Sequence, residues 1–415
     1  MEVVVTGIGL VSALGRLEPS WQRLLSRESG IQPYQPFPDL PSWPLARVGQ
    51  AVTSLEKLTQ LVMADALQDA GLAMPLPDTG VVIGSSRSCQ ASWEQLARRF
   101  GTGKGTEGEG ESGRMGEFQS FPPHPLTSKT QFPVIGLESW LDTLPHHAAI
   151  AIARQVGSNG PVLAPMAACA TGIWAIAQGF ELIQTGQCQR VIVGAVEAPI
   201  TPLTLAGFEK MGALAYTGSY PFDRHREGLV LGEGAAVLVL ESAYLAKQRA
   251  APVYGQVLGF GLTSDAYHVS APDPDRRSAI TAVKQCLERS HLLPSDINYI
   301  HAHGTGTQLN DQHEAQLIQW LFGHRVPVSS TKGATGHTLG ASGVLGAAFC
   351  LMALKHQLLP PCVGLKESDF ELDLVTTARQ GEVGSVLCFS FGFGGQNAVM
   401  ALGNYQESHG ERSPT

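Results

Sequence analysis

The chain has 415 residues, 43% of them hydrophobic and 15% charged, and its formal net charge is −8. A chain of this length and composition can bury a large core, as two domains or as one domain with two halves, and it does not belong to the disordered class. The acidic balance argues against nucleic acid as the main partner, and an acidic protein partner would need a local basic patch.

Cysteine usage and hydropathy bear on the compartment. The seven cysteines are scattered, odd in number and without CxxC pairs, which predicts buried thiols in a reducing, cytoplasmic setting. We find no uninterrupted apolar stretch of about 18 residues that predicts a membrane span. The sequence opens directly on a strand-like segment at residues 3–5, so we expect no signal segment and no membrane partner.

Short apolar strands alternate with helical segments in the first half of the chain. The pattern predicts strands at 3–9, 80–84, 190–195 and 234–241, and helices at 55–70, 148–156 and from 169 to about 185. Residues 101–113 are polar and glycine-rich, which predicts a flexible surface loop.

The same alternation starts again after a break near residues 245–252. The pattern predicts strands at 253–260, 297–303, 385–390 and 398–402, and helices at 278–290 and 340–354. Alternating strands and helices favour a mainly parallel sheet covered by helices. We therefore predict two halves, 1–250 and 251–415, of similar order but without a clear sequence repeat.

Three residues stand out as a chemical set. Cys169 stands at a predicted helix start, and His303 and His337 each stand in a glycine-rich turn far downstream. One thiol and two histidines in these places are typical of covalent acyl transfer. A helix N-terminus can lower the pKa of a thiol, which would favour a reactive thiolate. An inert core residue is the commoner explanation of a single cysteine or histidine, and it is kept for the other six cysteines and eleven histidines.

A metal site is the alternative use of these histidines. His301 and His303 would share one face of a strand, but no third ligand suggests itself. His313 and Glu314 do not continue into an HExxH motif. We therefore expect no bound metal.

Five motifs, with the two histidine turns counted as one, stand in order over nearly the full length and resemble those of the β-ketoacyl-acyl carrier protein synthases. They are an opening strand, a nucleophile turn, an internal signature, two histidine turns and a closing loop, at residues 3–9, 168–172, 221–234, 303–307, 332–337 and 391–395. The resemblance implies an α/β fold of thiolase type, in which two similar halves form a five-layer αβαβα stack. Such proteins are usually homodimers.

The resemblance also implies catalytic roles. Cys169 would be the nucleophile that accepts an acyl chain, while His303 and His337 would donate to the enolate that forms when a malonyl thioester loses CO2. Lys332 would support His337 electrostatically. Phe393 would act as a gate, and its backbone N–H, with that of Cys169, would form an oxyanion hole.

Further residues would bind the substrates. The family pattern implies that the hydroxyls of Thr305 and Thr307 bind the amides of a phosphopantetheine arm, and that Leu144 lines an acyl tunnel across a dimer interface. The arm belongs to the partner acyl carrier protein, so no cofactor is expected on this chain. Structural roles, without catalysis, are expected for Asp223, Arg224, Glu233, Asp311 and Glu314.

The chain departs from the family pattern in three places. Gly346 stands where active members usually carry a glutamate that supports the lysine, so Lys332 is expected to be less well anchored. Ser270 and Ala271 replace a usual pair of hydroxyl residues. The basic face for carrier docking is weak, and its candidates are Lys57, Arg98, Arg99, Lys104, Arg114, Lys210, Arg224 and Arg226.

The expected activity is the decarboxylating Claisen condensation of malonyl carrier protein with an acyl chain bound to Cys169, in fatty-acid or polyketide-type elongation. A chain-length-factor-like, non-catalytic partner subunit is the main alternative: Gly346 favours it, whereas the intact nucleophile and histidines disfavour it. A thiolase would carry a second catalytic cysteine where this chain has Phe391-Gly392-Phe393.

Overall fold

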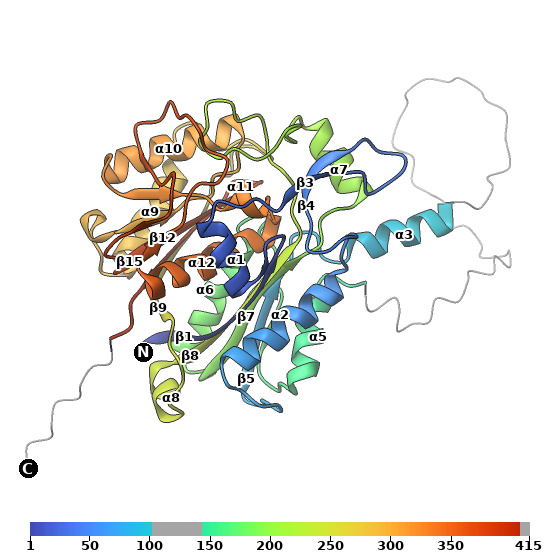
Figure 1. Ribbon diagram of the computed structural model, residues 1–415. Helices are drawn as coiled ribbons and strands as arrows, with labels where there is room; N and C mark the ends of the chain where they lie inside the picture. Colours follow the sequence, from blue (N-terminus) through green and yellow to red (C-terminus); the bar gives the residue numbers. More distant parts are fainter. Residues whose placement is uncertain (102–142, 407–415) are drawn as a thin grey trace, which may run out of the picture.

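The computed structural model describes residues 1–101 and 143–406 (Figure 1). Most of the segment predicted as a flexible loop, residues 102–113, lies outside this described part. Within the described residues, a 12-stranded sheet runs through the molecule. Its strands form two groups, which meet where β1 (Val3–Ser12) pairs with β9 (Gly255–Ser264).

The two groups of strands repeat one pairing pattern. The N-terminal group runs β1–β8–β7–β5–β6, and the C-terminal group runs β9–β16–β15–β10–β11 with β13 at its edge. In each group of five, the first two contacts are antiparallel and the next two are parallel. The strands are β5 (Thr79–Gly84), β6 (Val162–Leu163), β7 (Arg190–Glu197), β8 (Gly234–Ser242), β10 (Tyr299–His301), β11 (Pro327–Ser329), β13 (Asp373–Leu374), β15 (Ser385–Gly392) and β16 (Gln396–Gly403).

Helices cover both groups and fill the space between them, which makes five layers (Figure 1). One pair packs on the outer face of the N-terminal strands, a second pair on the outer face of the C-terminal strands, and a third pair lies between the groups. The pairs are α2 (Leu55–Asp69) with α5 (His147–Val156), α9 (Arg277–Arg289) with α10 (Gln308–Phe322), and α6 (Thr171–Gln184) with α12 (Ser342–His356). The predicted α/β, thiolase-type stack of two similar halves is confirmed. The prediction of a mainly parallel sheet is wrong, because six pairings in this sheet are antiparallel and five are parallel.

The two central helices approach closely because of a glycine. A Cβ at Gly172 would lie 2.6 Å from the backbone nitrogen of Val344, a separation that real Cβ atoms essentially never show. Gly172 lies in the first turn of α6, just after Cys169, and Val344 lies in the first turn of α12, soon after His337. This approach brings the nucleophile and the second histidine together.

Most predicted elements are confirmed with shifted ends. The strand predicted at 297–303 is shorter, because β10 covers only Tyr299–His301 and the chain then turns. Several short or largely polar elements were not predicted. They are α1 (Leu17–Leu25), α3 (Gln90–Gly101), α7 (Pro202–Lys210), α8 (Ala243–Gln248), α10, α11 (Lys332–Thr335), the 3-10 turns Pro294–Asp296 and Leu339–Ala341, and strands β2 (Gly15–Arg16), β3 (Ile31–Tyr34), β4 (Trp43–Ala46), β6, β11, β12 (Leu358–Leu359), β13 and β14 (Arg379–Gln380).

One described segment, Leu339–His356, is helical, long and apolar enough to cross a membrane, but 89% of it is buried inside the protein. It comprises a 3-10 turn and α12, which lies between the two strand groups. Burial on all sides explains why it is apolar all round, as expected for a core helix.

Candidate active site

Cys169 lies on a sharp turn between β6 and α6. Ala168 has a φ of 47°, in the left-handed region that residues with a Cβ seldom adopt. The Thr171 hydroxyl holds this turn, because it accepts from the N–H of Ala167 at 2.9 Å and donates to the carbonyl of Ala168 at 2.7 Å. From β15, the Ser390 hydroxyl donates to the Cys169 carbonyl at 2.8 Å. The backbone around the sulfur is therefore fixed by both halves of the chain.

His303 follows β10 in a turn held by two buried carboxylates of α10. Glu314 accepts from the backbone N–H groups of His303 and Gly304 at 2.6 and 2.7 Å. Asp311 accepts from the N–H of Gly306 at 3.2 Å. Both glycines have positive φ, 40° and 78°, which explains their presence here. The expected structural role of Asp311 and Glu314 is confirmed.

His337 enters the site from the turn after α11. Its backbone N–H donates to the carbonyl of Val230 at 2.6 Å. Its Nδ1 lies 2.8 Å from the Ser342 hydroxyl, and its Nε2 lies 3.2 Å from the Cys169 sulfur. A hydroxyl can donate or accept, so Ser342 supports either tautomer of this imidazole.

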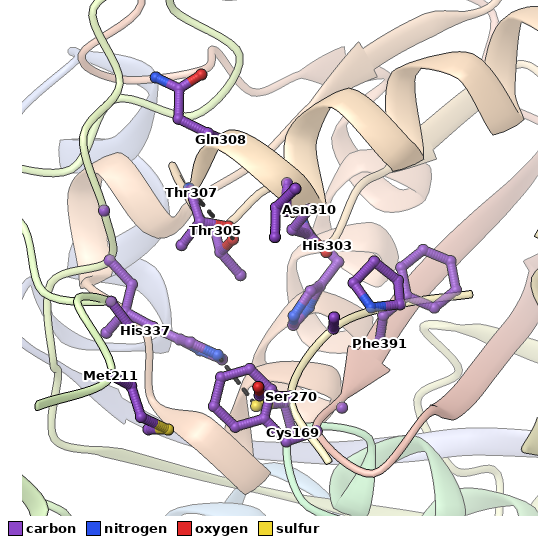
Figure 2. Close-up of a pocket in the computed structure, with 18 of the residues that line it drawn as sticks. Cys169, Met211, Ser270, His303, Thr305, Thr307, Gln308, Asn310, His337 and Phe391 are labelled. Carbon is purple, nitrogen blue, oxygen red and sulfur yellow. Dashed lines mark hydrogen bonds between the residues drawn. The ribbon is translucent and has the colours of Figure 1, made fainter. Parts of the chain in front are cut away.

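The three predicted side chains meet in one pocket, with His337 directed at the Cys169 sulfur (Figure 2). The Cys169 sulfur and one ring nitrogen each of His303 and His337 lie within 4.8 Å of one another. The two imidazole rings are 5.3 Å apart between centroids and nearly perpendicular. All three line a cavity of about 290 Å³. The predicted meeting of these residues is confirmed.

Burial controls the protonation of the nucleophile. Desolvation raises the pKa of the Cys169 thiol to about 11, against smaller lowering effects from the charge of Lys332 and the N–H of Phe393. The lowering of the pKa that a helix start can give is therefore outweighed at this position. Cys169 lies one residue before the N-cap of α6, Ala170, and the cost of burying a thiolate outweighs the favourable groups. The resting nucleophile is a neutral thiol beside an imidazole.

Both imidazoles are neutral at rest. Burial first, and the charge of Lys332 second, lower the pKa of His303 and of His337 well below the usual 6.5. A neutral imidazole accepts a proton at one nitrogen and donates from the other. The pair can therefore both take up the thiol proton and donate to an oxygen in the pocket.

Lys332 makes its direct contact with the first histidine. Its Nζ donates to the carbonyl of His303 and lies 3.4 Å from the Nδ1 of the same residue. The resemblance implied support of His337, and the hydrogen bonds run to His303 instead, although the lysine charge lowers the pKa of both imidazoles. An ammonium donor at Nδ1 leaves the proton of His303 on Nε2.

Phe393 lies beside the sulfur on the turn between β15 and β16. Its backbone N–H lies close enough to the Cys169 sulfur to lower the pKa of that thiol slightly, and its ring stacks on Phe208 of α7 at 6.0 Å between centroids. Gly394 and Gly395 follow with φ of 78° and 73°. The placement suits an oxyanion donor, and the gate role stays a prediction.

Two hydroxyls expected to bind the carrier arm also reach the pocket. Thr305 and Thr307 line it, and their hydroxyl oxygens lie 2.9 Å apart (Figure 2). Ser270 and Ala271 line it as well, so the altered pair retains one hydroxyl there. Leu144 is partly buried and is not among the described residues around this cavity, and its role in an acyl tunnel stays a prediction.

The basic residues named as candidates for carrier docking differ in their exposure to solvent. Arg226 is 7% exposed and donates to the carbonyls of Asp223 and Gln308, so its choice was wrong. Arg224 forms two ion pairs with neighbouring carboxylates, in line with a structural role. Exposed candidates are Lys57, Arg98 and Lys210, whereas Arg99, Lys104 and Arg114 lie outside the described side chains.

The remaining structural carboxylates are confirmed as such. Asp223 accepts from the backbone N–H groups of Lys366 and Glu367 at 2.7 and 3.0 Å. Glu233 accepts from the N–H of Thr53 at 2.6 Å. Each of these carboxylates ties a loop to the body of the protein.

The catalytic set also has the spacing of metal ligands. One sulfur and two imidazole nitrogens within 4.8 Å are a donor set that Zn²⁺ accepts. A metal would need the Cys169 thiolate, which burial disfavours. His301 does not belong to this donor set among the described residues, and its Nε2 lies 3.1 Å from the Thr331 hydroxyl. The absence of a resident metal stays a prediction.

Sequence reasoning missed three residues around the site. Ser342 contacts His337, and Phe208 stacks on Phe393. Glu197 is fully buried, accepts from the N–H of Arg87 at 3.3 Å, and has its pKa raised to about 7 by burial. A carboxylate that directly follows the apolar run 191–196 was the available signal for Glu197, whereas no local signal marks the other two.

Comparisons with known proteins agree with this geometry. The family descriptions "Beta-ketoacyl synthase, N-terminal domain" and "Beta-ketoacyl synthase, C-terminal domain" match residues 46–246 and 254–366. A 3-oxoacyl-[acyl-carrier-protein] synthase 2 of Synechocystis is 33% identical, over 97% of this chain and 98% of its own. A tetracenomycin ketoacyl synthase alpha subunit of Streptomyces glaucescens is 39% identical over 62% of this chain and 63% of its own.

Solved structures give the same result at the level of fold. A type II polyketide ketosynthase, in complex with its acyl-carrier protein and bound to the hexaketide, has a TM-score of 0.86 at 26% identity, covering 97% of this chain and 99% of its own. A β-ketoacyl synthase from Burkholderia phymatum has a TM-score of 0.83 at 26% identity, covering 98% of this chain and all of its own.

The fold and the Cys–His–His pocket define a condensing enzyme of the thiolase type, which transfers acyl groups. The chain belongs to the β-ketoacyl synthase family, as its sequence motifs predicted. The first matched range ends at residue 246 and the second begins at residue 254. The predicted domain boundary at 250 stays a prediction.

Proposed function

We propose that the protein condenses a malonyl thioester, with loss of CO2, onto an acyl group held by Cys169. Both substrates would arrive on acyl carrier protein, in fatty-acid or polyketide-type elongation. The observation that carries the proposal is the placement of the Cys169 sulfur and two neutral imidazoles within 4.8 Å in one cavity. That arrangement supplies a nucleophile, a base for its proton and two donors for an enolate.

The first step is acyl transfer. The Cys169 sulfur attacks the carbonyl of the acyl thioester, and its proton passes to the Nε2 of His337, 3.2 Å away. The backbone N–H groups of Cys169 and Phe393 stabilise the oxyanion. The bond to the pantetheine sulfur then breaks, and that sulfur leaves with the proton held by His337.

The second step is decarboxylation. The bond between the malonyl carboxylate and its neighbouring carbon breaks, CO2 leaves, and the electron pair forms an enolate. The Nε2–H groups of His303 and His337 donate to the enolate oxygen. Lys332 fixes this tautomer of His303. For His337 the Ser342 hydroxyl, which can donate or accept, supports the same tautomer in this step by donating to its Nδ1.

The third step is condensation. The enolate carbon attacks the acyl carbonyl on Cys169, and the same backbone N–H groups hold the oxyanion. The carbon–sulfur bond breaks and the Cys169 sulfur regains a proton, so one proton is consumed for each CO2 released. The product is a β-ketoacyl thioester two carbons longer, still on the carrier.

The carrier arm would occupy the cavity in front of the nucleophile. The Thr305 and Thr307 hydroxyls suit its amide groups, and Met211 and Leu309 provide apolar walls. The phosphopantetheine belongs to the carrier protein, so this chain needs no cofactor of its own. A solved relative described as a complex of a ketosynthase with its acyl-carrier protein supports the choice of partner.

We also assign a homodimer in the cytoplasm. The sheet ends at the short strand β6, where Leu163 is 38% exposed, and Met166 just beyond it is 58% exposed. Apolar side chains at a sheet edge that no further strand of the described residues covers favour coverage by a second copy of the chain. Leu144 would line the acyl tunnel in such a dimer. All seven cysteines are buried thiols, which suits a reducing compartment.

A chain-length-factor-like subunit is the competing function. Some solved relatives are described as ketosynthase and chain-length-factor assemblies. A subunit that only shapes a tunnel would not need Cys169, His303 and His337 in contact, and this contact favours the enzyme.

An extension assay decides between the two. Purified protein is mixed with acyl and malonyl carrier proteins of several chain lengths, and both carrier and enzyme are analysed by mass spectrometry. The wild type should form an acyl adduct on Cys169 and release CO2, Cys169→Ala should form no adduct, and His303→Ala should acylate but release little CO2. A wild type that acylates with no donor would favour the non-catalytic subunit.

A further inference from the structure

Gly346, within α12, occupies a position where no side chain fits. A Cβ built there would lie 2.8 Å from both Cε1 and Nδ1 of His301 and 2.9 Å from the sulfur of Cys388, closer than real Cβ atoms come to other atoms. All three residues are buried. The family pattern usually has a glutamate at this position, and its absence led us to expect that Lys332 is less well anchored. In the structure, the ring of His301 fills the space next to Gly346.

His301 is held in place by one short hydrogen bond and one long, weak contact to a sulfur. It ends β10, two residues before His303, and is 2% exposed. Its Nε2 lies 3.1 Å from the Thr331 hydroxyl. Its Nδ1 is 4.0 Å from the Cys388 sulfur, a weak contact by comparison. The ring orientation is therefore set by Thr331 on one side and by the backbone of Gly346 on the other.

Thr331 is the residue from which α11 starts. Its carbonyl accepts from the N–H groups of Ala334 and Thr335, both at 3.0 Å. The next residue is Lys332, whose Nζ contacts the carbonyl and the Nδ1 of His303. A displacement of Thr331 would therefore move the lysine away from the imidazole whose tautomer it fixes.

We infer that His301 is a positioning residue: its imidazole holds Thr331, and through it Lys332, beside His303, and position 346 is glycine because that imidazole occupies its space. The step affected, decarboxylation, rests on the proposed function. The fit between His301 and Gly346 does not rest on it, so the two parts are tested separately.

The fit is tested by thermal unfolding of four proteins: wild type, Gly346→Ala, His301→Ala and the double variant. In the wild-type background, Gly346→Ala should lower the melting temperature because of the clash. In the His301→Ala background, the same change should raise it, because the Cys388 sulfur can move into the vacated space and alanine favours a helix more than glycine. Gly207→Ala in α7, where a Cβ meets nothing within 4 Å, is the control and should raise the melting temperature in both backgrounds. The same sign for Gly346→Ala in both backgrounds would overturn this part.

The positioning role is tested with two substitutions of similar size. His301→Gln keeps a polar group within reach of Thr331, and His301→Leu does not. CO2 release from malonyl carrier protein should fall on the order of tenfold in His301→Leu and about threefold or less in His301→Gln, while acylation of Cys169 stays within about twofold in both. Equal losses in the two variants, or a parallel loss of acylation and decarboxylation, would refute the role. A wild type without acylation would refute the proposed function and leave the unfolding result standing.

Discussion

The sulfur of Cys169 lies 3.2 Å from the Nε2 of His337, although the two residues are 168 positions apart in the chain. They occupy matching places in the two halves. Cys169 follows β6 and precedes α6, while His337 follows β11 and precedes α12, and β6 and β11 are the fifth strands of their groups. The internal symmetry of the fold therefore places an acid and a base face to face.

Alkylation of Cys169 should report its raised pKa. Because burial raises the pKa of this thiol to about 11, the rate of labelling by iodoacetamide should rise about tenfold per pH unit between about pH 7 and pH 10, without a plateau. Mass spectrometry of the labelled peptide measures the rate, and Cys169→Ala provides the blank. A plateau near neutral pH would mean a preformed thiolate–imidazolium pair and would contradict a neutral resting thiol.

Replacing Lys332 by methionine should separate the two half-reactions. The methionine fills a similar volume without the charge, so His303 loses the donor that keeps its proton on Nε2. We expect CO2 release from malonyl carrier protein to fall roughly 100-fold, while acylation of Cys169 falls much less. Equal losses in both steps would show that Lys332 acts by another route.

The free energy of unfolding should depend on pH through two buried histidines and two buried glutamates, which act in opposite directions. The pKa of His303 and His337 is lowered well below 6.5, so as pH falls below that value the unfolded chain takes up protons that these folded residues do not, and stability is lost. Burial raises the pKa of Glu197 and Glu314 to about 7, so their contribution is lost as pH rises from 4.5. Each proton by which the unfolded and folded chains differ changes the free energy of unfolding by up to about 1.4 kcal/mol per pH unit.

These opposing contributions predict a nearly flat stability profile for the wild type between about pH 5 and pH 6.5. In the double variant His303→Gln/His337→Gln, the carboxyl contribution should dominate, so the free energy of unfolding in urea should fall as pH rises over this range. A variant whose profile matches that of the wild type would show that the two imidazoles are protonated in the folded protein.

Lys210 should contribute to recognition of the carrier protein. It is exposed at the end of α7, next to Met211 in the cavity wall. Lys210→Glu should raise KM for malonyl carrier protein several-fold and leave KM for malonyl-pantetheine unchanged, since the small substrate lacks the acidic protein surface. Lys57→Glu, on α2, is the comparison for a lysine outside the cavity wall. A similar rise for both substrates would place the effect in the cavity instead.

Removal of metal ions should leave the enzyme active. Dialysis against EDTA should not change the condensation rate, whereas added Zn²⁺ should inhibit by binding Cys169 and the two histidines. Metal analysis of the purified protein accompanies the assay. Loss of activity on dialysis, with recovery on adding a metal, would identify a resident ion.

Much of the fold and the site followed from local signals. Glycine-rich turns and short apolar strands mark positions where the backbone has few alternatives, so Cys169, His303 and His337 could be placed at the ends of their elements. The family motifs then supplied the stack of two halves. The meeting of Cys169, His303 and His337 in one pocket tested the family assignment directly, because these residues come from distant segments of the chain.

Sequence reasoning was insufficient where burial or long-range contacts determine a residue's pKa or its partners. The direction of the Cys169 pKa depends on desolvation by the folded core, which outweighs the local effect of the helix start. The partner of Lys332, His303, lies 29 residues away in the turn after β10, and the fate of Arg226 depends on a buried loop. The sequence around His301 and around Gly346 does not indicate that the two residues pack against each other.

The division of the site between the halves has a practical consequence. A chain cut between α8 and β9 would leave the thiol on one fragment and both imidazoles on the other. Turnover would then require the two fragments to reassemble, so this enzyme offers a split reporter whose signal is carbon–carbon bond formation.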